Sequence, residues 1–302
     1  MEPRDCISPT PTGSNDMKTH SSNLILCYGE VLWDCLPQGL FLGGAPLNVA
    51  YHLRRLGQNS QMISAVGHDL LGDETKRRLT RWGFSIDLLS TSKKRPTGTV
   101  RVDVGPRGQP KFEIIREVAW DDIQLSSTSR ILAPRALAVV FGSLAQRSEN
   151  NRRKLQELLR LTEGALRIFD VNLRPPFDPS ARVLELCREA DVIKLNDQEL
   201  QRFVGASKPL PLELRARRFA ERTACQRICV TAGARGAGAL WDGKWFWENA
   251  RPVNVVDTVG AGDAFLAGFL NAWTQQAPVG RCLQQACRLA EYVAARPGAQ
   301  PE

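Results

Sequence analysis

Short apolar runs alternate along the chain with longer amphipathic stretches. Runs of this length are typical of buried strands, and amphipathic stretches with a period of 3.6 residues are typical of helices. The strand-like runs lie at 24–32, 60–67, 137–143, 166–172, 191–196, 227–233 and 252–256. Because strands joined through helices run parallel, the pattern predicts an α/β fold with a doubly wound, mainly parallel sheet and helices on both faces.

Glycines mark the ends of the first two predicted helices. The helix at 45–57 ends at Gly57, and the helix at 70–83 ends at Gly83. Glycine is favoured at the C′ position because the backbone there often adopts a left-handed conformation. We therefore predict that both helices stop at these glycines.

One region departs from the alternation of strands and helices. Residues 97–118 alternate apolar and polar positions around the sequence GPRGQP, which is typical of an antiparallel hairpin. A flap over a ligand site and a plain edge hairpin account for this pattern equally well. No linker divides the rest of the chain, so we expect a disordered leader at 1–22 and one domain at 23–302.

The chain of 302 residues carries a net charge of +8, which suits an anionic ligand and also suits nucleic acid. Its basic residues are interleaved with acids and aliphatic residues, which favours solvated helix faces over a polynucleotide groove. No apolar run reaches about 18 residues, so no membrane span is predicted. We expect small-molecule partners, no nucleic acid, no membrane and, since the N-terminus lacks the apolar core of a secretory signal, a cytoplasmic location.

The patterns of cysteine, glycine and histidine argue against a disulfide-bonded protein, a P-loop or dinucleotide-binding protein, and a Ser-His-Asp hydrolase. Four of the eight cysteines lie in apolar segments, which indicates reduced, buried thiols: Cys27, Cys35, Cys187 and Cys229. No P-loop sequence is present, and GAGDAF has Phe265 where a dinucleotide-binding motif needs its third glycine. The three histidines lie in different kinds of segment, so no Ser-His-Asp arrangement emerges.

The sequence VVDTVGAGDAFLAGFL places small residues and an acid at the start of an apolar helix. Gly260, Ala261 and Gly262 have almost no side chain, so their N–H groups can approach an anion at the positive end of the helix dipole. Asp263 would repel that anion unless it had another role. General-base catalysis on a hydroxyl that attacks a phosphate is such a role, and a stabilising acid in the first helical turn is the alternative.

Five motifs resemble, in the same order, those of the ribokinase-like (PfkB) family of sugar and nucleoside kinases. They are GGAPLNVAYHLRRLG, VGHDLLGDE, KLNDQE, VTAGARGA and DTVGAGDAF, and the resemblance covers about residues 24–300. The segments GEVLWDCLP, GGAPLNVA, FDVNLRPPF and VAWDDI are most similar to fructokinase-type members. The resemblance implies a ribokinase-like fold with a small β lid, built from the hairpin near 97–118 and a short segment near 31–41.

The resemblance implies which residues bind the sugar. Asp34, Gly43, Gly44 and Asn48 would bind sugar hydroxyls, and Arg174 would face the sugar or the transferring phosphate. The residues alone leave simpler interpretations open. Gly43 and Gly44 fit a turn before a helix, Asn48 fits a helix surface, and Arg174 fits a loop charge.

On the nucleotide side, the resemblance implies a cradle for ATP and Mg²⁺. Asn196 and Glu199 would orient Mg²⁺ through its waters, although a box that caps a helix explains the same pair. Asp257 and Thr258 are expected to shape the turn and not to take part in the reaction. Cys287 stands where many relatives carry Asn, so contacts with the adenine of ATP are less well supported than contacts with its phosphates. The remaining roles are a nucleotide lining by Thr231, Gly233 and Gly236, an anion hole of Gly260, Ala261 and Gly262 amides, and Asp263 as base.

These residues together predict ATP-dependent phosphorylation of a sugar primary hydroxyl, with fructose as the expected sugar and fructose 6-phosphate as the product. The alternatives are 2-keto-3-deoxygluconate, ribose or a nucleoside as substrate, and a non-catalytic sugar-sensing relative. Activation by a monovalent cation such as K⁺ and a homodimer formed through the lid are further implications of the resemblance.

Overall fold

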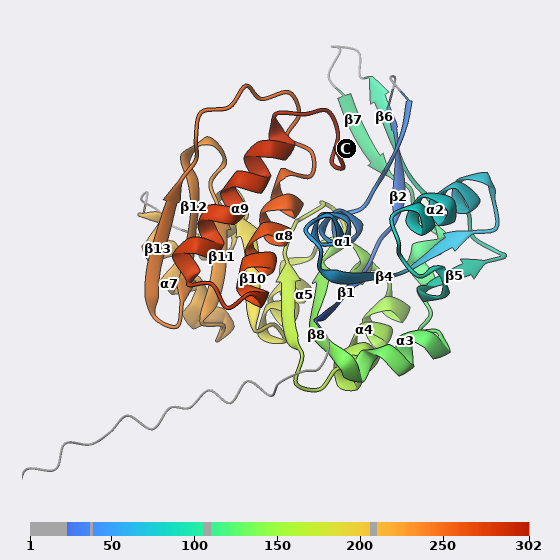
Figure 1. Ribbon diagram of the computed structural model, residues 1–302, viewed down its shortest axis with the longest axis horizontal. Helices are drawn as coiled ribbons and strands as arrows, with labels where there is room; N and C mark the ends of the chain where they lie inside the picture. The colour runs from blue at the N-terminus through green and yellow to red at the C-terminus, as the bar shows by residue number, and fades with distance from the viewer. Residues whose placement is uncertain (1–22, 37–38, 105–109, 206–209, 302) are drawn as a thin grey trace, which may run out of the picture.

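Two β-sheets organise the chain (Figure 1). The structure is a computed structural model that describes residues 23–36, 39–104, 110–205 and 210–301. Within these ranges the larger sheet has nine strands in the order β13-β12-β11-β10-β9-β8-β1-β4-β5. They are β1 (Leu24–Tyr28), β4 (Asn59–Gly67), β5 (Leu89–Ser92), β8 (Ala136–Gly142), β9 (Leu166–Asp170), β10 (Val192–Asn196), β11 (Arg227–Thr231), β12 (Gly236–Trp241) and β13 (Lys244–Asn249). Neighbouring strands in the stretch β11-β10-β9-β8-β1-β4-β5 of this order pair in parallel. The last two strands, β12 and β13, pair antiparallel and extend the sheet beyond β11.

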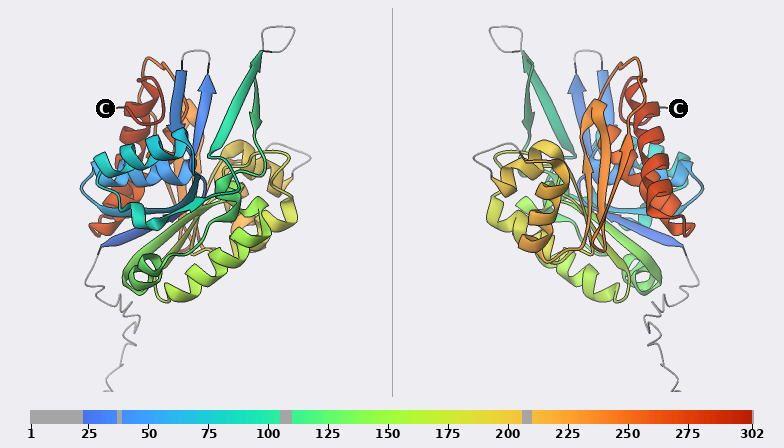
Figure 2. Two further views of the ribbon diagram at one scale, coloured as in Figure 1. Left: turned by 90° about the vertical axis from the view of Figure 1, so that its right-hand side faces the viewer. Right: turned by 90° about the vertical axis from the view of Figure 1, so that its left-hand side faces the viewer.

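Helices cover both faces of this sheet (Figure 2). Alternate residues of β1 show why: Ile25 and Cys27 pack with one set of helices, and Leu24 and Leu26 with the other. The first set is α1 (Ala45–Arg55), α2 (Leu70–Arg81), α8 (Ala261–Thr274) and α9 (Val279–Ala294). The second set is α4 (Glu149–Leu161), α5 (Ser180–Arg188), α6 (Asp197–Val204) and α7 (Leu212–Thr223), with α3 (Ser127–Leu132) beside them.

A second, four-stranded sheet stands beyond the body (Figure 2). Its order is β3-β2-β6-β7, from β2 (Leu32–Leu36), β3 (Gly39–Gly43), β6 (Gly98–Val104) and β7 (Pro110–Ile114). The hairpin expected at 97–118 therefore pairs with β2 and forms a lid, instead of extending the edge of the large sheet. Its turn and the expected leader lie outside the described residues. The predicted fold class, an α/β doubly wound sheet with a small β lid, is confirmed.

The prediction of one strand at 24–32 is wrong, because this run divides between the two sheets. The chain leaves β1 at Gly29, whose φ is +152°, and enters β2 of the lid at Leu32. A side chain at Gly29 would meet Pro46 Cγ at 2.7 Å, so the close approach of α1 requires glycine at this turn. An apolar run does not reveal a change of sheet.

The prediction of a strand at 252–256 is also wrong. This segment is irregular, and Val253, Val255 and Val256 are exposed. It follows β13, the edge strand, and returns to the body without a strand partner. The N–H groups of Val256 and Asp257 donate instead to the carbonyl of Ala294 at the end of α9.

The two predicted helix ends are confirmed. Helices α1 and α2 finish at Arg55 and Arg81, and the glycines that follow adopt left-handed φ values of +84° at Gly57 and +81° at Gly83. Smaller 3-10 helices connect other elements: η1 (Ile86–Leu88), η2 (Ala119–Asp122), η3 (Ala133–Arg135), η4 (Leu144–Arg147) and η5 (Gly233–Arg235).

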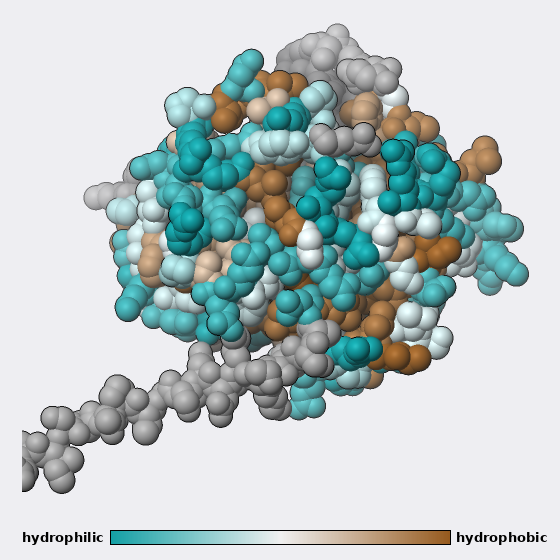
Figure 3. Space-filling model, viewed as in Figure 1, coloured by the Kyte–Doolittle hydropathy of each residue, from teal (hydrophilic) through white to brown (hydrophobic). Residues whose placement is uncertain are grey.

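The core and the surface follow the expected distribution of polarity. The seven described cysteines are free thiols, and all are buried except the half-buried Cys35. Hydrophilic residues cover most of the face that carries α1, α2, α8 and α9 (Figure 3). Across the described ranges, no helix has the length and apolar character needed to cross a membrane.

Candidate active site

Several predicted sugar-side residues meet between the lid and the carboxyl ends of the strands. Asn48 Nδ2 donates a hydrogen bond of 2.7 Å to Asp263 Oδ2, although 215 residues separate the two. A side chain at Gly43 would lie 3.1 Å from Asp34 Oδ2, so the glycine leaves the lid carboxylate accessible. Ligands of open α/β sheets bind at this edge, which makes it the candidate active site.

Asp263 lies in the first turn of α8 and is only 7% exposed. Burial, followed by the negative charge of Asp170, raises the pKa of Asp263 to about 6, whereas Lys194 and the Asn48 hydrogen bond act in the opposite direction. A carboxyl group with this pKa is ionised at neutral pH yet basic enough to accept a proton from a hydroxyl.

The start of α8 offers unpaired N–H groups beside Asp263. Within the described residues, the N–H groups of Gly262 and Asp263 have no acceptor, whereas Ala264 N–H donates to Gly260 O. Gly260 has a φ of +78°, and a side chain there would come within 2.5 Å of Ala299 Cβ. Gly260 and Gly262 therefore leave the N-terminus of α8 open, so that its free N–H groups can approach an anion.

A buried lysine faces this helix N-terminus, and the sequence prediction missed it. Lys194 Nζ in β10 lies 3.0 Å from Asp170 Oδ1 and 3.1 Å from its Oδ2, and both side chains are buried. A Cβ at Gly262 would lie 3.0 Å from the same Nζ. Burial lowers the pKa of Lys194, but Asp170 and Asp263 raise it more, so the ammonium stays charged. The available signal was a lysine inside the apolar run VIKLN.

Arg174 lies among carboxylates of the sugar side. Burial raises the pKa of Asp34 to about 6, and the positive charge of Arg174 partly reverses that rise. Glu30, a second residue that the sequence prediction missed, is 4% exposed, and burial raises its pKa to about 7. Its Oε2 has no hydrogen-bond partner among the described residues, so it is free to accept from a sugar hydroxyl.

Asn196 and Glu199 form the capping box at the start of α6. Asn196 Oδ1 accepts from Glu199 N–H, and Glu199 Oε2 accepts from Asn196 N–H, each at 2.8 Å. Glu199 Oε1 also accepts from Leu173 N–H at 2.7 Å, which ties α6 to the segment that carries Arg174. Each oxygen keeps a second lone pair, so the pair fits contact with Mg²⁺ through water. Over the described ranges, no three His, Cys, Asp or Glu side chains form a direct metal site.

The predicted nucleotide lining lies next to this box. Thr231 in β11 is the register partner of Asn196 in β10, so the two strand ends adjoin. Gly233 has a φ of +57° and open space around it. Gly236 is required for a structural reason, because a side chain there would lie 2.1 Å from Glu248 O of β13.

The end of the described chain supports the site from one side. Asp257 accepts from Val259 N–H at 2.9 Å and Gly298 N–H at 3.1 Å, as expected for a residue that shapes the turn before α8. Gln300 Nε2 donates to Asn48 Oδ1 at 2.8 Å, which orients the Asn48 amide toward Asp263.

Sequence comparison links the chain to sugar kinases. Residues 18–302 match the pfkB family carbohydrate kinases. Fructokinase of Salmonella typhimurium is 33% identical over 254 residues, which cover 80% of this chain and 81% of that protein. Fructokinase of Escherichia coli is 31% identical over 255 residues, with 80% and 81% covered.

Solved structures share the fold. Fructokinase from Xylella fastidiosa, determined with bound ATP, superposes with a TM-score of 0.78 at 24% identity and covers 92% of this chain and 94% of that chain. Fructokinase from Vibrio cholerae O395 with fructose, ADP and calcium superposes with a TM-score of 0.77 at 25% identity, covering 93% and 95%.

Proposed function

The chain belongs to the pfkB family of carbohydrate kinases, and on that basis we propose that it is a fructokinase. It would transfer the γ-phosphoryl group of ATP to the primary hydroxyl of fructose, giving fructose 6-phosphate. Relatives named fructokinase that are more than 30% identical over four-fifths of the chain support fructose over the other candidate sugars.

The observation that carries the proposal is the position of Asp263. Its buried carboxylate accepts a hydrogen bond from Asn48 on the sugar side and lies beside the free N–H groups of α8 on the phosphate side. A general base for phosphoryl transfer must lie within hydrogen-bond reach of the attacking hydroxyl, near the phosphate but off the line of attack.

In the proposed mechanism, Asp34 and Asn48 hold sugar hydroxyls, with Gly43 and Gly44 giving space for the ring. Asp263 removes the proton from the attacking hydroxyl as its oxygen approaches the γ-phosphorus. Arg174 stabilises negative charge on the transferring group, because its guanidinium fork suits phosphate oxygens.

The residues on the other side of Asp263 would bind ATP and Mg²⁺. Mg²⁺ bound to ATP supplies charge neutralisation, and Asn196 and Glu199 would hold its waters. The N–H groups of Gly260 and Gly262 would stabilise the charge that develops in the transition state, whereas the Ala261 N–H already donates to Thr258 O at 3.3 Å. Thr231, Gly233 and Gly236 would line the nucleotide. A K⁺ ion is present in a Vibrio cholerae fructokinase structure, and we extend monovalent-cation activation to this chain as part of the proposal.

The lid would close over the sugar and exclude water from the phosphoryl group. This role suits the β2–β3 and β6–β7 hairpins, because Asp34 lies in β2 and reaches the sugar side of the site. The domain at 23–302 would then act as one kinase unit with a lid near 97–118 and 31–41.

A sugar panel tests the proposed substrate. ADP release is measured with fructose, 2-keto-3-deoxygluconate, ribose and a nucleoside at saturating ATP and Mg²⁺. We expect the highest kcat/KM with fructose, by at least about tenfold, because a missing hydroxyl leaves a buried acceptor unpaired. A higher value with another substrate would replace fructose, and binding without turnover of any would indicate a sugar sensor.

A further inference from the structure

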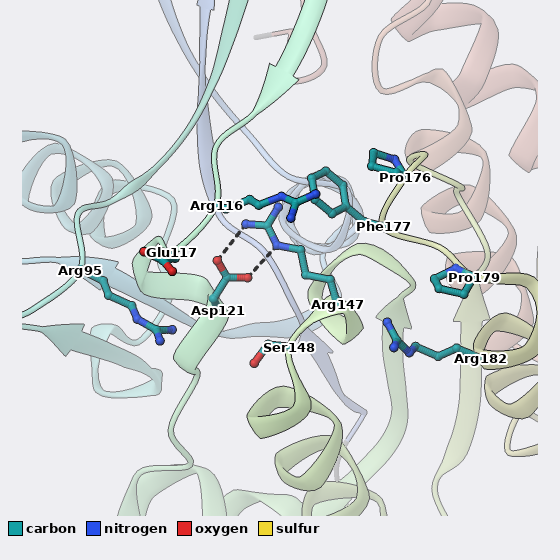
Figure 4. Close-up of a pocket in the computed structure, with 10 residues that line it drawn as sticks. All are labelled: Arg95, Arg116, Glu117, Asp121, Arg147, Ser148, Pro176, Phe177, Pro179 and Arg182. Carbon is teal, nitrogen blue, oxygen red and sulfur yellow. Dashed lines mark hydrogen bonds and ion pairs between the residues drawn. The ribbon is translucent and has the colours of Figure 1, made fainter.

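A second pocket lies outside the proposed catalytic site (Figure 4). It has a volume of about 380 Å³ and forms between the base of the lid, η2, η4 and the segment that leads into α5. Four of its lining residues are arginines, Arg95, Arg116, Arg147 and Arg182. None of the sugar-side or nucleotide-side residues lines it, so the proposed kinase reaction does not account for its charge.

Arg147 is held rigidly at the wall of this pocket. Its Nε and Nη2 donate to the two carboxylate oxygens of Asp121 at 2.7 and 2.8 Å, and Nη2 also donates to Ile115 O. The guanidinium lies 4.0 Å from the ring centre of Trp120 and 4.7 Å from that of Phe177. The side chain is only 8% exposed, yet Nη1 has no acceptor among the described residues. A buried donor without a partner is costly, which indicates that an external group completes it.

The other three arginines leave their charge unpaired. Arg95, Arg116 and Arg182 make no ion pair with any described residue, and Arg116 stacks on the ring of Phe177. Burial and then the like charge of Arg152 lower the pKa of Arg182, whereas Glu185 acts in the opposite direction. Two acids also line the pocket, Glu117 and Asp121. Asp121 is paired with Arg147, which leaves Glu117 as the one remaining acid among the described lining residues, beside three arginines. The excess of positive charge favours an anion.

The charge and the donors of the pocket suit an anion with several acceptor oxygens. Arg95 and Arg182 extend from opposite sides, with Ser148 between them in the view of Figure 4. Ser148 is the N-cap of α4, so the positive end of a 13-residue helix adds to the attraction. Arginine forks match phosphate oxygens, and the apolar wall of Phe177, Pro176 and Pro179 suits the carbon skeleton of an ester. We propose that this pocket binds the phosphate group of a small phosphate ester or free phosphate, separately from the catalytic site.

Equilibrium binding tests the proposal with two probes, inorganic phosphate and glucose 6-phosphate. Calorimetric titration of the wild-type protein should show saturable binding of at least one probe. Arg95→Gln and Arg182→Gln should each weaken that binding by at least about tenfold, since each removes a charge-assisted contact. Tighter binding of glucose 6-phosphate would assign the pocket to an ester, and equal binding would assign it to free phosphate.

Two control variants distinguish binding at this pocket from nonspecific electrostatic binding and from binding at the proposed catalytic site. Arg188→Gln removes an exposed arginine from the far end of α5 and should leave binding unchanged. Asp34→Ala removes a proposed sugar contact and should also bind both probes as the wild type does. Absence of binding, equal losses in Arg188→Gln, or loss in Asp34→Ala with retention in Arg182→Gln would each overturn the proposal. Far-ultraviolet circular dichroism confirms that each variant is folded.

Discussion

At the scale of single residues, the site depends on a balance of buried charges. Asp263 and Asp170 are two buried carboxylates, and Lys194 compensates them from between β9 and α8. Burial alone favours a protonated Asp263, which would be useless as a base. Lys194 therefore helps to keep Asp263 ionised, while burial and then the charge of Asp170 hold the pKa of Asp263 above its ordinary range.

The raised pKa predicts the pH dependence of the reaction. Since the pKa of Asp263 is about 6, protonation below that pH removes the base. We expect kcat/KM for fructose to fall by at least about tenfold per pH unit below about pH 6, more steeply where Asp34, whose pKa is also about 6, is protonated as well, and to level off above it. A rate profile from about pH 5 to about pH 8 checks this. Constant activity down to the lowest of these pH values would show that Asp263 does not limit the rate.

Changes at Lys194 should move this profile. Lys194→Met removes the compensating charge, so the acidic limb should shift toward higher pH by about one unit or more, whereas Lys194→Arg should keep it near its original position. Because an unpaired Asp170 also destabilises the fold, the double variant Lys194→Met, Asp170→Asn is the matched control. It removes both charges and should return the limb toward the wild-type position. An unshifted limb in a folded Lys194→Met protein would contradict the charge balance.

At the scale of elements, the N-terminus of α8 depends on small residues. Gly262→Ala adds a methyl group 3.0 Å from Lys194 Nζ, where the phosphate is expected. The helix preference of alanine is offset by this close contact with a buried, ion-paired ammonium, so we expect little change in melting temperature together with a loss of at least about tenfold in kcat/KM for ATP.

Gly280→Ala provides the control for that change. Gly280 lies in the first turn of α9, and a side chain there would meet nothing within 4 Å. The same substitution should leave both KM and kcat unchanged. Equal activity of the two variants would mean that the α8 N-terminus does not approach the phosphates.

Strands and helices were predictable from the sequence wherever their own periodicity decided them. The alternation of strands and helices was sufficient for the fold class, because each buried run and each amphipathic stretch has its own period. It failed at 24–32 and 252–256, since a change of sheet at Gly29 and the exposure of Val255 depend on tertiary neighbours.

The site was predictable only where residues lie in recognisable motifs. The motifs predicted Asp34, Asn48 and Asp263 as site residues, and the structure brings Asn48 and Asp263 into contact. Lys194 was missed because a lysine inside a strand does not indicate a site until the residues of β9 and α8 that contact it are known. The arginine pocket was also missed, since its members come from four distant segments and form no motif.

At the scale of the whole molecule, the lid carries exposed apolar residues. Leu40 and Phe41 in β3, an edge strand of the small sheet, are 51% and 41% exposed. An exposed apolar edge strand favours pairing with another chain. This agrees with the homodimer through the lid that the family resemblance implies.

Sedimentation velocity checks this association. We expect a dimer for the wild-type chain and a monomer for the double variant Leu40→Lys, Phe41→Lys, because the introduced charges repel across a symmetric contact. Ile131→Lys, which changes a 70% exposed residue in α3, should remain a dimer. A wild-type monomer, or a dimer that persists in the double variant, would contradict a lid-mediated contact.

The central claim is that Asp263 is the base of a sugar kinase, and Asp263→Asn tests it most directly. The variant keeps the shape and the contact with Asn48, and it removes a buried charge, so it should be at least as stable at neutral pH. Linkage gives the direction of the effect. The folded-state pKa of Asp263 is about 6, above the ordinary aspartate value of 3.8, so the folded protein loses stability as pH rises through this interval.

The measurement is ADP release with fructose, beside calorimetric binding of ATP, for the wild type and Asp263→Asn. We expect kcat to fall by at least about 10²-fold with ATP affinity unchanged, because general-base catalysis contributes about that much. Turnover close to the wild-type rate in a folded variant that binds ATP would contradict the account.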